Sequence, residues 1–215
     1  MTCGPSLFLA SLCSAMLAIS ACEKQRDKAQ QTANDSIAAP RASGALQARA
    51  IIAGPPNSGI KGEVTLVELQ GNFPEPGVQI NARITGSTAE LAPGPHGLHI
   101  HENAIGECVP PYTSAGGHFD PGPAGNPDPD VNHPYHMGDV PNLIVDGSGA
   151  GSLQAITSRI TLSPGPLSVL DKNGSAIVLH GEADQGVSGP AKSGVSGGPR
   201  IACGVIERIS DSVGE

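Results

Sequence analysis

Glycine and proline recur along almost the whole of this chain and limit the kind of fold that it can adopt. The 215 residues include 29 glycines and 20 prolines, and both residue types interrupt helices and mark turns between short segments. Aromatic residues make up 2% of the chain and tryptophan is absent, so a core has to be built from Val, Ile, Leu and Ala. This composition favours short strands and loops over long helices.

Apolar and polar residues alternate in the segments between these turns. Residues 78–84 alternate at every position, which is the pattern of a strand with one buried face. We expect eight strands, at 47–53, 61–69, 78–84, 97–102, 141–145, 151–162, 175–180 and 201–209. Together with two long loops, at 103–135 and 181–199, they predict an all-β fold, an eight-stranded antiparallel Greek-key sandwich or flattened barrel. Loops of this length are commonly functional.

The amino-terminal region has the features of an export signal. The first 22 residues carry no charged side chain, and residues 7–19 are apolar, which is too short for a membrane-spanning helix of about 20 residues. The run Ile-Ser-Ala-Cys at 19–22 resembles the end of a bacterial lipoprotein signal. We therefore expect a lipoprotein-type signal peptide over 1–21, lipidation of Cys22, a flexible polar tether over 22–45 and a folded domain over 46–215. An ordinary cleaved signal with an incidental Cys22 is the alternative.

Charge and cysteine content agree with an exported domain. The formal net charge is −8, which argues against nucleic acid and against an anionic membrane surface as partners. Contact with a membrane is expected only through the lipid on Cys22, and the expected location is the cell envelope or periplasm. The domain contains two cysteines, Cys108 and Cys203, and one pair in an exported domain is expected to form a disulfide.

Four histidines lie in or near the predicted strands. His99 and His101 are two positions apart, so the period of a strand places both imidazoles on one face. His118 and His180 come from distant segments. Four imidazoles without a thiolate suit Cu(II). For His99 and His101 taken alone, polar surface histidines of a β-domain are the alternative.

Five segments that carry these and other polar residues follow one another along the chain. They are 97–102 (Gly-Leu-His-Ile-His-Glu), 116–121 (Gly-Gly-His-Phe-Asp-Pro), 136–139 (His-Met-Gly-Asp), 180–184 (His-Gly-Glu-Ala-Asp) and 200–205 (Arg-Ile-Ala-Cys-Gly-Val). Together they resemble the copper/zinc superoxide dismutase family over about residues 46–209. The resemblance implies an oxidoreductase that disproportionates superoxide to dioxygen and hydrogen peroxide by copper redox cycling, with copper and zinc as cofactors.

The resemblance also implies which residues hold the metals. Copper is expected on His99, His101, His118 and His180, and His118 is expected to bridge to a zinc ion held also by His136 and Asp139. The family usually has a further zinc histidine at the position of Asn126, and an amide is a weak zinc ligand. We expect His133 to fill this place through a rearranged loop. The alternatives are a site with three ligands, Asp128 or Asp130.

Three more residues receive roles from the resemblance. Arg200 is expected to be catalytic by docking the superoxide anion beside copper, and His118 by taking up and releasing a proton. Asp184 is expected to link the copper and zinc histidines, with a solvated loop aspartate as the alternative. His96 is expected to be structural.

Two other functions remain compatible with the sequence. One is a non-enzymatic copper-binding or copper-buffering lipoprotein on the same fold, because a fold alone does not decide function. The other is a copper-only superoxide dismutase with a vacant zinc site, because of Asn126. A homodimer is compatible with the sequence, which carries no signature of dimer contacts.

Overall fold

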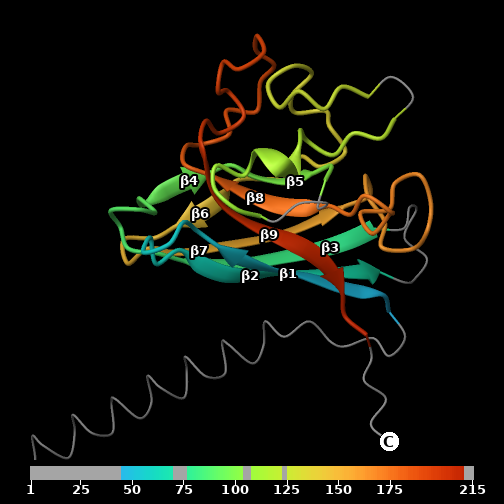
Figure 1. Ribbon diagram of the computed structural model, residues 1–215, viewed down its shortest axis with the longest axis horizontal. Helices are drawn as coiled ribbons and strands as arrows, with labels where there is room; N and C mark the ends of the chain where they lie inside the picture. Colours follow the sequence, from blue (N-terminus) through green and yellow to red (C-terminus); the bar gives the residue numbers. More distant parts are fainter. Residues whose placement is uncertain (1–44, 70–76, 104–107, 123–124, 211–215) are drawn as a thin grey trace, which may run out of the picture. The chain divides into compact units, whose positions relative to one another are not determined.

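The alternating segments form one sheet of nine antiparallel strands (Figure 1). The computed structural model describes residues 45–69, 77–103, 108–122 and 125–210. Across the sheet the strands follow the order β4-β6-β7-β3-β2-β1-β9-β8-β5. Their bounds are β1 Gln47–Ala53, β2 Lys61–Leu69, β3 Gly77–Thr85, β4 Gly94–His96, β5 Leu98–His101, β6 Leu143–Val145, β7 Ala150–Thr157, β8 Ala176–His180 and β9 Arg200–Arg208.

This architecture confirms the predicted all-β antiparallel class, but the described residues form nine strands instead of the expected eight. The additional strand is β4, which pairs with β6 through Gly94 opposite Val145 and His96 opposite Leu143. Its sequence, Pro93-Gly94-Pro95, predicts a turn, and proline is accepted here because β4 lies at the end of the sheet order. The described residues include one short 3-10 helix, η1, Thr113–Ala115.

The two ends of the sheet, β4 and β5, are separated in the chain by Gly97 alone. The amide of Gly97 donates to the carbonyl oxygen of Glu182 (2.8 Å), and its own carbonyl accepts from the amide of His180 (2.8 Å). These bonds hold the β4–β5 junction against the end of β8, so that the sheet is nearly closed into a barrel (Figure 1).

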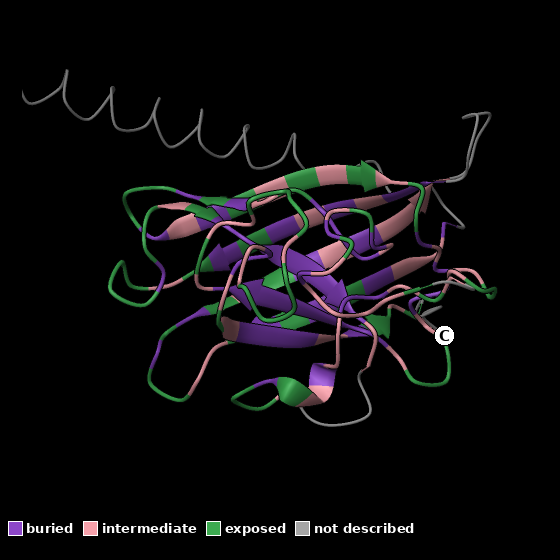
Figure 2. Cartoon of the chain, turned by 90° about the horizontal axis from the view of Figure 1, so that it is seen from above, coloured by how far each residue is buried: buried purple, intermediate pink, exposed green. Residues whose placement is uncertain are grey.

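The barrel interior is filled by aliphatic side chains from alternate strand positions. Figure 2 shows buried residues alternating with more exposed ones along strands of the sheet. Leu66, Ile80 and Ile84 are each at most 1% exposed, so nearly all of their apolar surface is removed from water. Burial of this kind contributes roughly 1.5–3 kcal/mol for each large aliphatic side chain. Within the residues that the structure describes, no helix is long and apolar enough to cross a membrane. The predicted signal peptide, Cys22 and tether residues 22–44 lie outside the described residues.

Strand β5 presents two different faces. Leu98 and Ile100 belong to the main core, so the alternation of the strand directs His99 and His101 to the opposite face. All four residues are fully buried, because the loop after β5 returns and covers the histidine face.

The returning loop is fixed to β5 by backbone hydrogen bonds. Ile100 donates to the carbonyl of Gly138 (3.0 Å) and accepts from the amide of Phe119 (2.9 Å). A Cβ atom on residue 138 would overlap the carbonyl oxygen of Ile100, so this approach requires glycine. The result is that His118 and Asp139, the neighbours of Phe119 and Gly138, lie beside β5.

The predicted disulfide between Cys108 and Cys203 is confirmed, with the two Cα atoms 5.4 Å apart. It connects the loop after β5 to β9 across a sequence separation of 95 residues. Around it lies a second, smaller apolar cluster, made of Tyr112, Ala115, Ala176, Val178 and Cys203. This cluster holds the segment that begins at Cys108 against β8 and β9.

The two long loops lie on the same side of the sheet, over β5 and β8 (Figure 1). Asp130 joins them. Its carboxylate accepts from the amide of Gly194 (2.9 Å) and from the amide and hydroxyl of Ser196 (3.1 and 2.9 Å), and its carbonyl accepts from the amide of Gly189 (2.8 Å). The two loops thus form one cover over the histidine face.

Candidate metal centre

The four histidines predicted to hold copper lie together under this cover. We call His99, His101, His118 and His180 the copper group. Strands β5 and β8 supply three of them and are paired antiparallel, while His118 forms an isolated bridge with His101. The ring centroids of His99 lie 4.3 Å from His118 and 5.0 Å from His180. One ligand atom from each of the four residues falls within 4.8 Å of the others.

In each ring of the copper group, one nitrogen lies within hydrogen-bond distance of a protein oxygen and the other has no hydrogen-bond partner among the described residues. The bound nitrogens of His101 and His180 face the carbonyl oxygens of Gly116 and Gly198, each at 3.1 Å. The other nitrogens are buried and have no hydrogen-bond partner among the described residues: His99 Nδ1, His101 Nε2, His118 Nε2 and His180 Nε2. Buried polar atoms without partners are costly. Four of them at one point fit a metal ion with imidazole ligands such as copper.

Burial keeps the imidazoles of this group neutral, which is the form that binds metal. It lowers the pKa of His99 to about 4, even though a hydrogen bond with Asp184 acts in the opposite direction. It also lowers the pKa of His118 to about 4 and that of His180 to about 3. At neutral pH copper therefore meets an uncharged imidazole at each of these three residues.

A second group lies beside the first and shares His118. We call His118, His133, His136 and Asp139 the zinc group; their ligand atoms also lie within 4.8 Å of one another. Asp139 is at its centre, with His118 Nδ1 2.7 Å from Oδ1, and His136 Nδ1 and His133 Nδ1 3.0 and 3.2 Å from Oδ2. The side chains are buried. Three imidazole nitrogens and one carboxylate are a suitable donor set for zinc.

The alternatives to His133 have other contacts. The side-chain oxygen of Asn126 accepts from the amide of Asp128 (3.1 Å). The carboxylate of Asp128 accepts from the amides of Asp130 and Val131, and that of Asp130 joins the two long loops as described above. The structure therefore brings His133 into the zinc group, while the side chains of Asn126, Asp128 and Asp130 are engaged by backbone amides.

Asp184 connects the two groups. Its Oδ2 lies 3.1 Å from His99 Nε2 and its Oδ1 lies 2.6 Å from His133 Nε2. Its carboxylate is buried, which by itself would raise its pKa, but the hydrogen bonds with the two histidines outweigh burial and lower the pKa. An ionised carboxylate that accepts from both rings fixes their orientation and makes the opposite nitrogens better donors to metal.

Burial also opposes protonation of His133, but its contacts with Asp139 and Asp184 prevail and raise its pKa to about 9. Burial is likewise outweighed at His136, whose pKa is raised by Asp139. In the metal-free protein, protons thus occupy the zinc group, and a metal ion would replace them.

Arg200 lies at the opening of the copper group. Its guanidinium donates to the carbonyl oxygens of Tyr112 (2.7 Å) and Gly116 (2.6 Å). Gly116 O also faces His101 Nδ1, so the arginine and a copper-group ring share one acceptor. A cavity of about 420 Å³ reaches both Arg200 and His180, and it is also lined by Asp128, Asp130 and Lys192.

His96 lies outside both groups. Its two ring nitrogens are 2.9 Å from the carbonyl oxygen of His180 and 2.8 Å from that of Ala92. It therefore joins β4 to the end of β8 through backbone atoms.

Asn142 contacts the candidate site, and the sequence did not predict this contact. Its side chain forms two hydrogen bonds with the backbone of Asp184. The available signal was an asparagine inside a segment predicted as a strand, where this residue type is disfavoured. In the structure β6 begins only at Leu143, and Asn142 belongs to the site.

Comparison with known proteins identifies relatives of this chain. Residues 60–206 match the model of the family described as copper/zinc superoxide dismutase (SODC). The chain is 42% identical over 141 residues to a superoxide dismutase [Cu-Zn] of Deinococcus radiodurans, a match that covers 61% of this chain and 73% of the relative. It is 39% identical over 131 residues to superoxide dismutase [Cu-Zn] 2 of Aquifex aeolicus, covering 60% and 70% of the two chains.

Two further comparisons agree with these. Superoxide dismutase [Cu-Zn] 1 of Salmonella typhimurium (strain LT2) is 34% identical over 126 residues, covering 55% of this chain and 66% of the relative. Among solved structures, a crystal structure of the clock protein EA4 superposes with a TM-score of 0.57 and 29% identity, over 74% of this chain and 92% of that one.

Proposed function

The chain belongs to the copper/zinc superoxide dismutase family, and we propose that it converts two superoxide anions and two protons into dioxygen and hydrogen peroxide at the copper group. Copper and zinc are its cofactors. The observation that carries the proposal is the convergence of four buried, unpartnered imidazole nitrogens. Bound copper supplies the one-electron chemistry, since it can accept an electron from one superoxide and return it to the next.

The ligands follow from the two groups. Copper is bound by His99, His101, His118 and His180, and zinc by His118, His133, His136 and Asp139. The support for His133 is its distance of 3.2 Å from Asp139 and the engagement of Asn126, Asp128 and Asp130 in other contacts. Bound zinc would order the segment that covers the histidines, because all four of its ligands lie between β5 and β6.

The protein contributes orientation, charge and a proton carrier. Arg200 faces the same cavity as His180, and its fixed guanidinium attracts and orients the superoxide anion. His118 Nε2 is buried and faces the copper group, so it can hold the proton that the second superoxide receives. Asp184 fixes the orientation of the His99 and His133 rings, because each of its two carboxylate oxygens contacts one of them.

The protein is exported, and the disulfide fits an oxidising compartment. Residues 1–21 act as a lipoprotein-type signal peptide, and Cys22 carries the lipid. Residues 22–45 form the tether of the domain that begins at residue 46. The support is the apolar stretch 7–19, the Ile-Ser-Ala-Cys run and the polar composition that follows. Mass spectrometry of the protein isolated from membranes tests whether Cys22 carries a lipid. Sedimentation of the purified protein tests whether it forms a homodimer.

The deciding experiment measures metal content and superoxide turnover on one sample. The purified protein is loaded with both metals and assayed by elemental analysis. One copper, one zinc and rapid turnover are expected. Copper without turnover would favour a copper-buffering lipoprotein instead, and copper without zinc but with turnover would favour a copper-only enzyme.

A further inference from the structure

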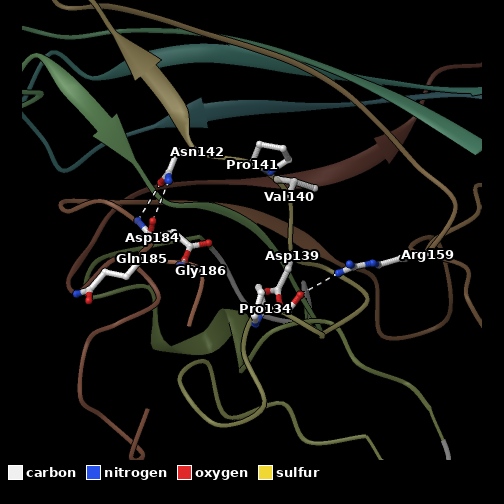
Figure 3. Close-up of a pocket in the computed structure, with 9 residues that line it drawn as sticks. All are labelled: Pro134, Asp139, Val140, Pro141, Asn142, Arg159, Asp184, Gln185 and Gly186. Carbon is white, nitrogen blue, oxygen red and sulfur yellow. Dashed lines mark hydrogen bonds between the residues drawn. The ribbon is translucent and has the colours of Figure 1, made fainter. Parts of the chain in front are cut away.

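A single arginine holds the segment that carries His133 and His136. One guanidinium nitrogen of Arg159, Nη1, donates to the carbonyl oxygens of Pro134 (3.0 Å) and His136 (3.1 Å). Figure 3 shows Arg159 reaching towards Pro134 at the wall of a cavity of about 500 Å³ that Asp139 also lines. The arginine therefore touches the backbone of the zinc group from its outer side.

This segment belongs to no strand or helix, since residues 131–138 form turns. Two local backbone hydrogen bonds are present among its described residues: the amide of Tyr135 donates to the carbonyl of Asn132 (2.9 Å), and that of Asp139 donates to the carbonyl of His136 (3.3 Å). The hydroxyl of Ser188 donates to the carbonyl of His133 (2.5 Å). Side chains from other parts of the chain thus fix much of its conformation.

Arg159 itself is attached to a rigid element. It lies two residues after the end of β7, and its amide donates to the hydroxyl of Thr157 (3.2 Å), the last residue of that strand. The next residue, Ile160, is fully buried in the main core. Arg159 is therefore anchored to the barrel, and its hydrogen bonds can fix the position of residues 131–138 relative to the barrel.

We propose that Arg159 is a positioning residue for zinc: by binding the carbonyls of Pro134 and His136 it fixes the spacing of the His133 and His136 rings. An arginine has no lone pair to offer a metal, so it acts only through the backbone. The inference rests on the proposed role of His133 and His136 as zinc ligands. It assigns to Arg159 a role in zinc affinity that copper affinity does not share, because the copper group draws on β5, β8 and His118.

The test compares three variants with the wild type. Arg159→Ala removes both bonds, and Arg159→Lys keeps a point charge that can serve one carbonyl. Arg208→Ala is the matched control, because Arg208 also donates to a loop carbonyl, that of Leu162 (3.3 Å), and Leu162 belongs to neither metal group. Each full-length protein is freed of metal, and its zinc and copper dissociation constants are measured by competition with chelators.

Arg159→Ala is expected to weaken zinc binding about tenfold, which corresponds to about 1.4 kcal/mol, and to leave copper binding within about twofold. Arg159→Lys should fall between Arg159→Ala and the wild type, and Arg208→Ala should match the wild type. Equal zinc affinity in Arg159→Ala and Arg208→Ala would overturn the inference, as would equal weakening of both metals. A wild-type protein that binds no zinc would overturn the proposed zinc group as well, which distinguishes the two failures.

Discussion

Asn142 binds both the backbone amide and the backbone carbonyl of Asp184. Its side-chain nitrogen donates to the carbonyl oxygen of Asp184 and its side-chain oxygen accepts from the amide of Asp184, both at 2.9 Å. Figure 3 shows the pair at the wall of the cavity that Arg159 also lines. The carboxylate of Asp184 contacts one ring in each metal group. By binding the backbone of Asp184, Asn142 helps to position a side chain that orients histidines in both groups.

Replacing Asn142 by alanine should therefore loosen Asp184. Two lost hydrogen bonds are expected to lower the free energy of unfolding of the metal-free protein by about 2 kcal/mol, measured by chemical denaturation. The affinities for both metals should fall together, because Asp184 contacts His99 as well as His133. A variant with unchanged stability and unchanged affinities would show that Asn142 does not hold Asp184.

His133→Ala should remove zinc and spare copper. Loss of a direct ligand is expected to weaken zinc binding by at least about a hundredfold, since even indirect partners of a metal contribute 10- to 100-fold. Elemental analysis after loading with both metals gives the result. Asn126→Ala is the control, and its zinc content should equal that of the wild type. If instead Asn126→Ala lost zinc and His133→Ala kept it, the assignment of the zinc ligands would be wrong.

Arg200→Ala should lower turnover while leaving copper content intact. The side chain forms charge-assisted bonds with the carbonyls of Tyr112 and Gly116, and it provides the cation at the cavity that reaches His180. We expect roughly a tenfold or greater fall in kcat/KM, on the scale of a lost interaction with a charged group. Loss of copper from the variant would instead make Arg200 a structural residue that holds His101 through Gly116.

Stability of the metal-free protein should fall on acidification. The pKa values of His99 and His118 are lowered to about 4 and that of His180 to about 3, chiefly by burial, against about 6.5 in the unfolded chain. On acidification the unfolded state binds protons first. The stability that these neutral rings contribute is present above about pH 6.5 and is lost as the pH falls from there towards 4 and 3.

His133 has the opposite dependence. Its contacts with Asp139 and Asp184 outweigh burial and raise its pKa to about 9, so its contribution is full below about pH 6.5 and is lost as the pH rises through 9. The Tm of the metal-free protein, measured by circular dichroism between pH 4.5 and 9.5, should therefore pass through a maximum near neutral pH. His133→Ala should flatten the alkaline side and keep the acid side. A wild-type Tm that stays constant from pH 6.5 to 4.5 would contradict this account.

Removal of the disulfide should lower both the stability of the protein and its rate of superoxide turnover. Cys108 and Cys203 are separated by 95 residues, and in the chain-entropy model such a link contributes about 4 kcal/mol. The double variant with serine at both positions should unfold at a correspondingly lower denaturant concentration. Its turnover should also fall, because Tyr112, an acceptor of Arg200, lies in the segment that the disulfide anchors. Unchanged turnover at full copper loading would show that the segment keeps its place without the link.

Strand periodicity accounts for how well the barrel could be predicted. The bounds of β1 and β2 agree with the expected segments 47–53 and 61–69, because a run of turn residues, Pro-Pro-Asn-Ser-Gly at 55–59, separates the two strands. β4 was missed because proline and glycine predict a turn there, and its pairing with β6 depends on tertiary contacts. β7 ends at Thr157 instead of residue 162, since Leu162 and Ser163 bind the carboxylate of Glu68.

In the candidate site, too, some features could be predicted from the sequence and others could not. Ligand types and the pairing of His99 with His101 follow from motif and strand period. The contacts of Asn142 and Arg159 with loop backbone do not, because they join segments distant in sequence and leave no periodic signal. The competition among Asn126, His133 and the nearby aspartates is likewise decided by how an irregular loop folds back, which local propensity does not encode.

The two metal groups differ in how far apart along the chain their members lie, and this sets the order in which they can assemble. All members of the zinc group fall within residues 118–139, a short loop whose closure costs little entropy. The copper group requires His99 of β5 and His180 of β8, whose pairing closes a much longer loop. A chain that is still folding should thus be able to offer a binding site for zinc before it can offer one for copper. We therefore expect zinc-loaded, copper-free protein to form before copper is taken up, because copper needs β5 and β8 to have paired.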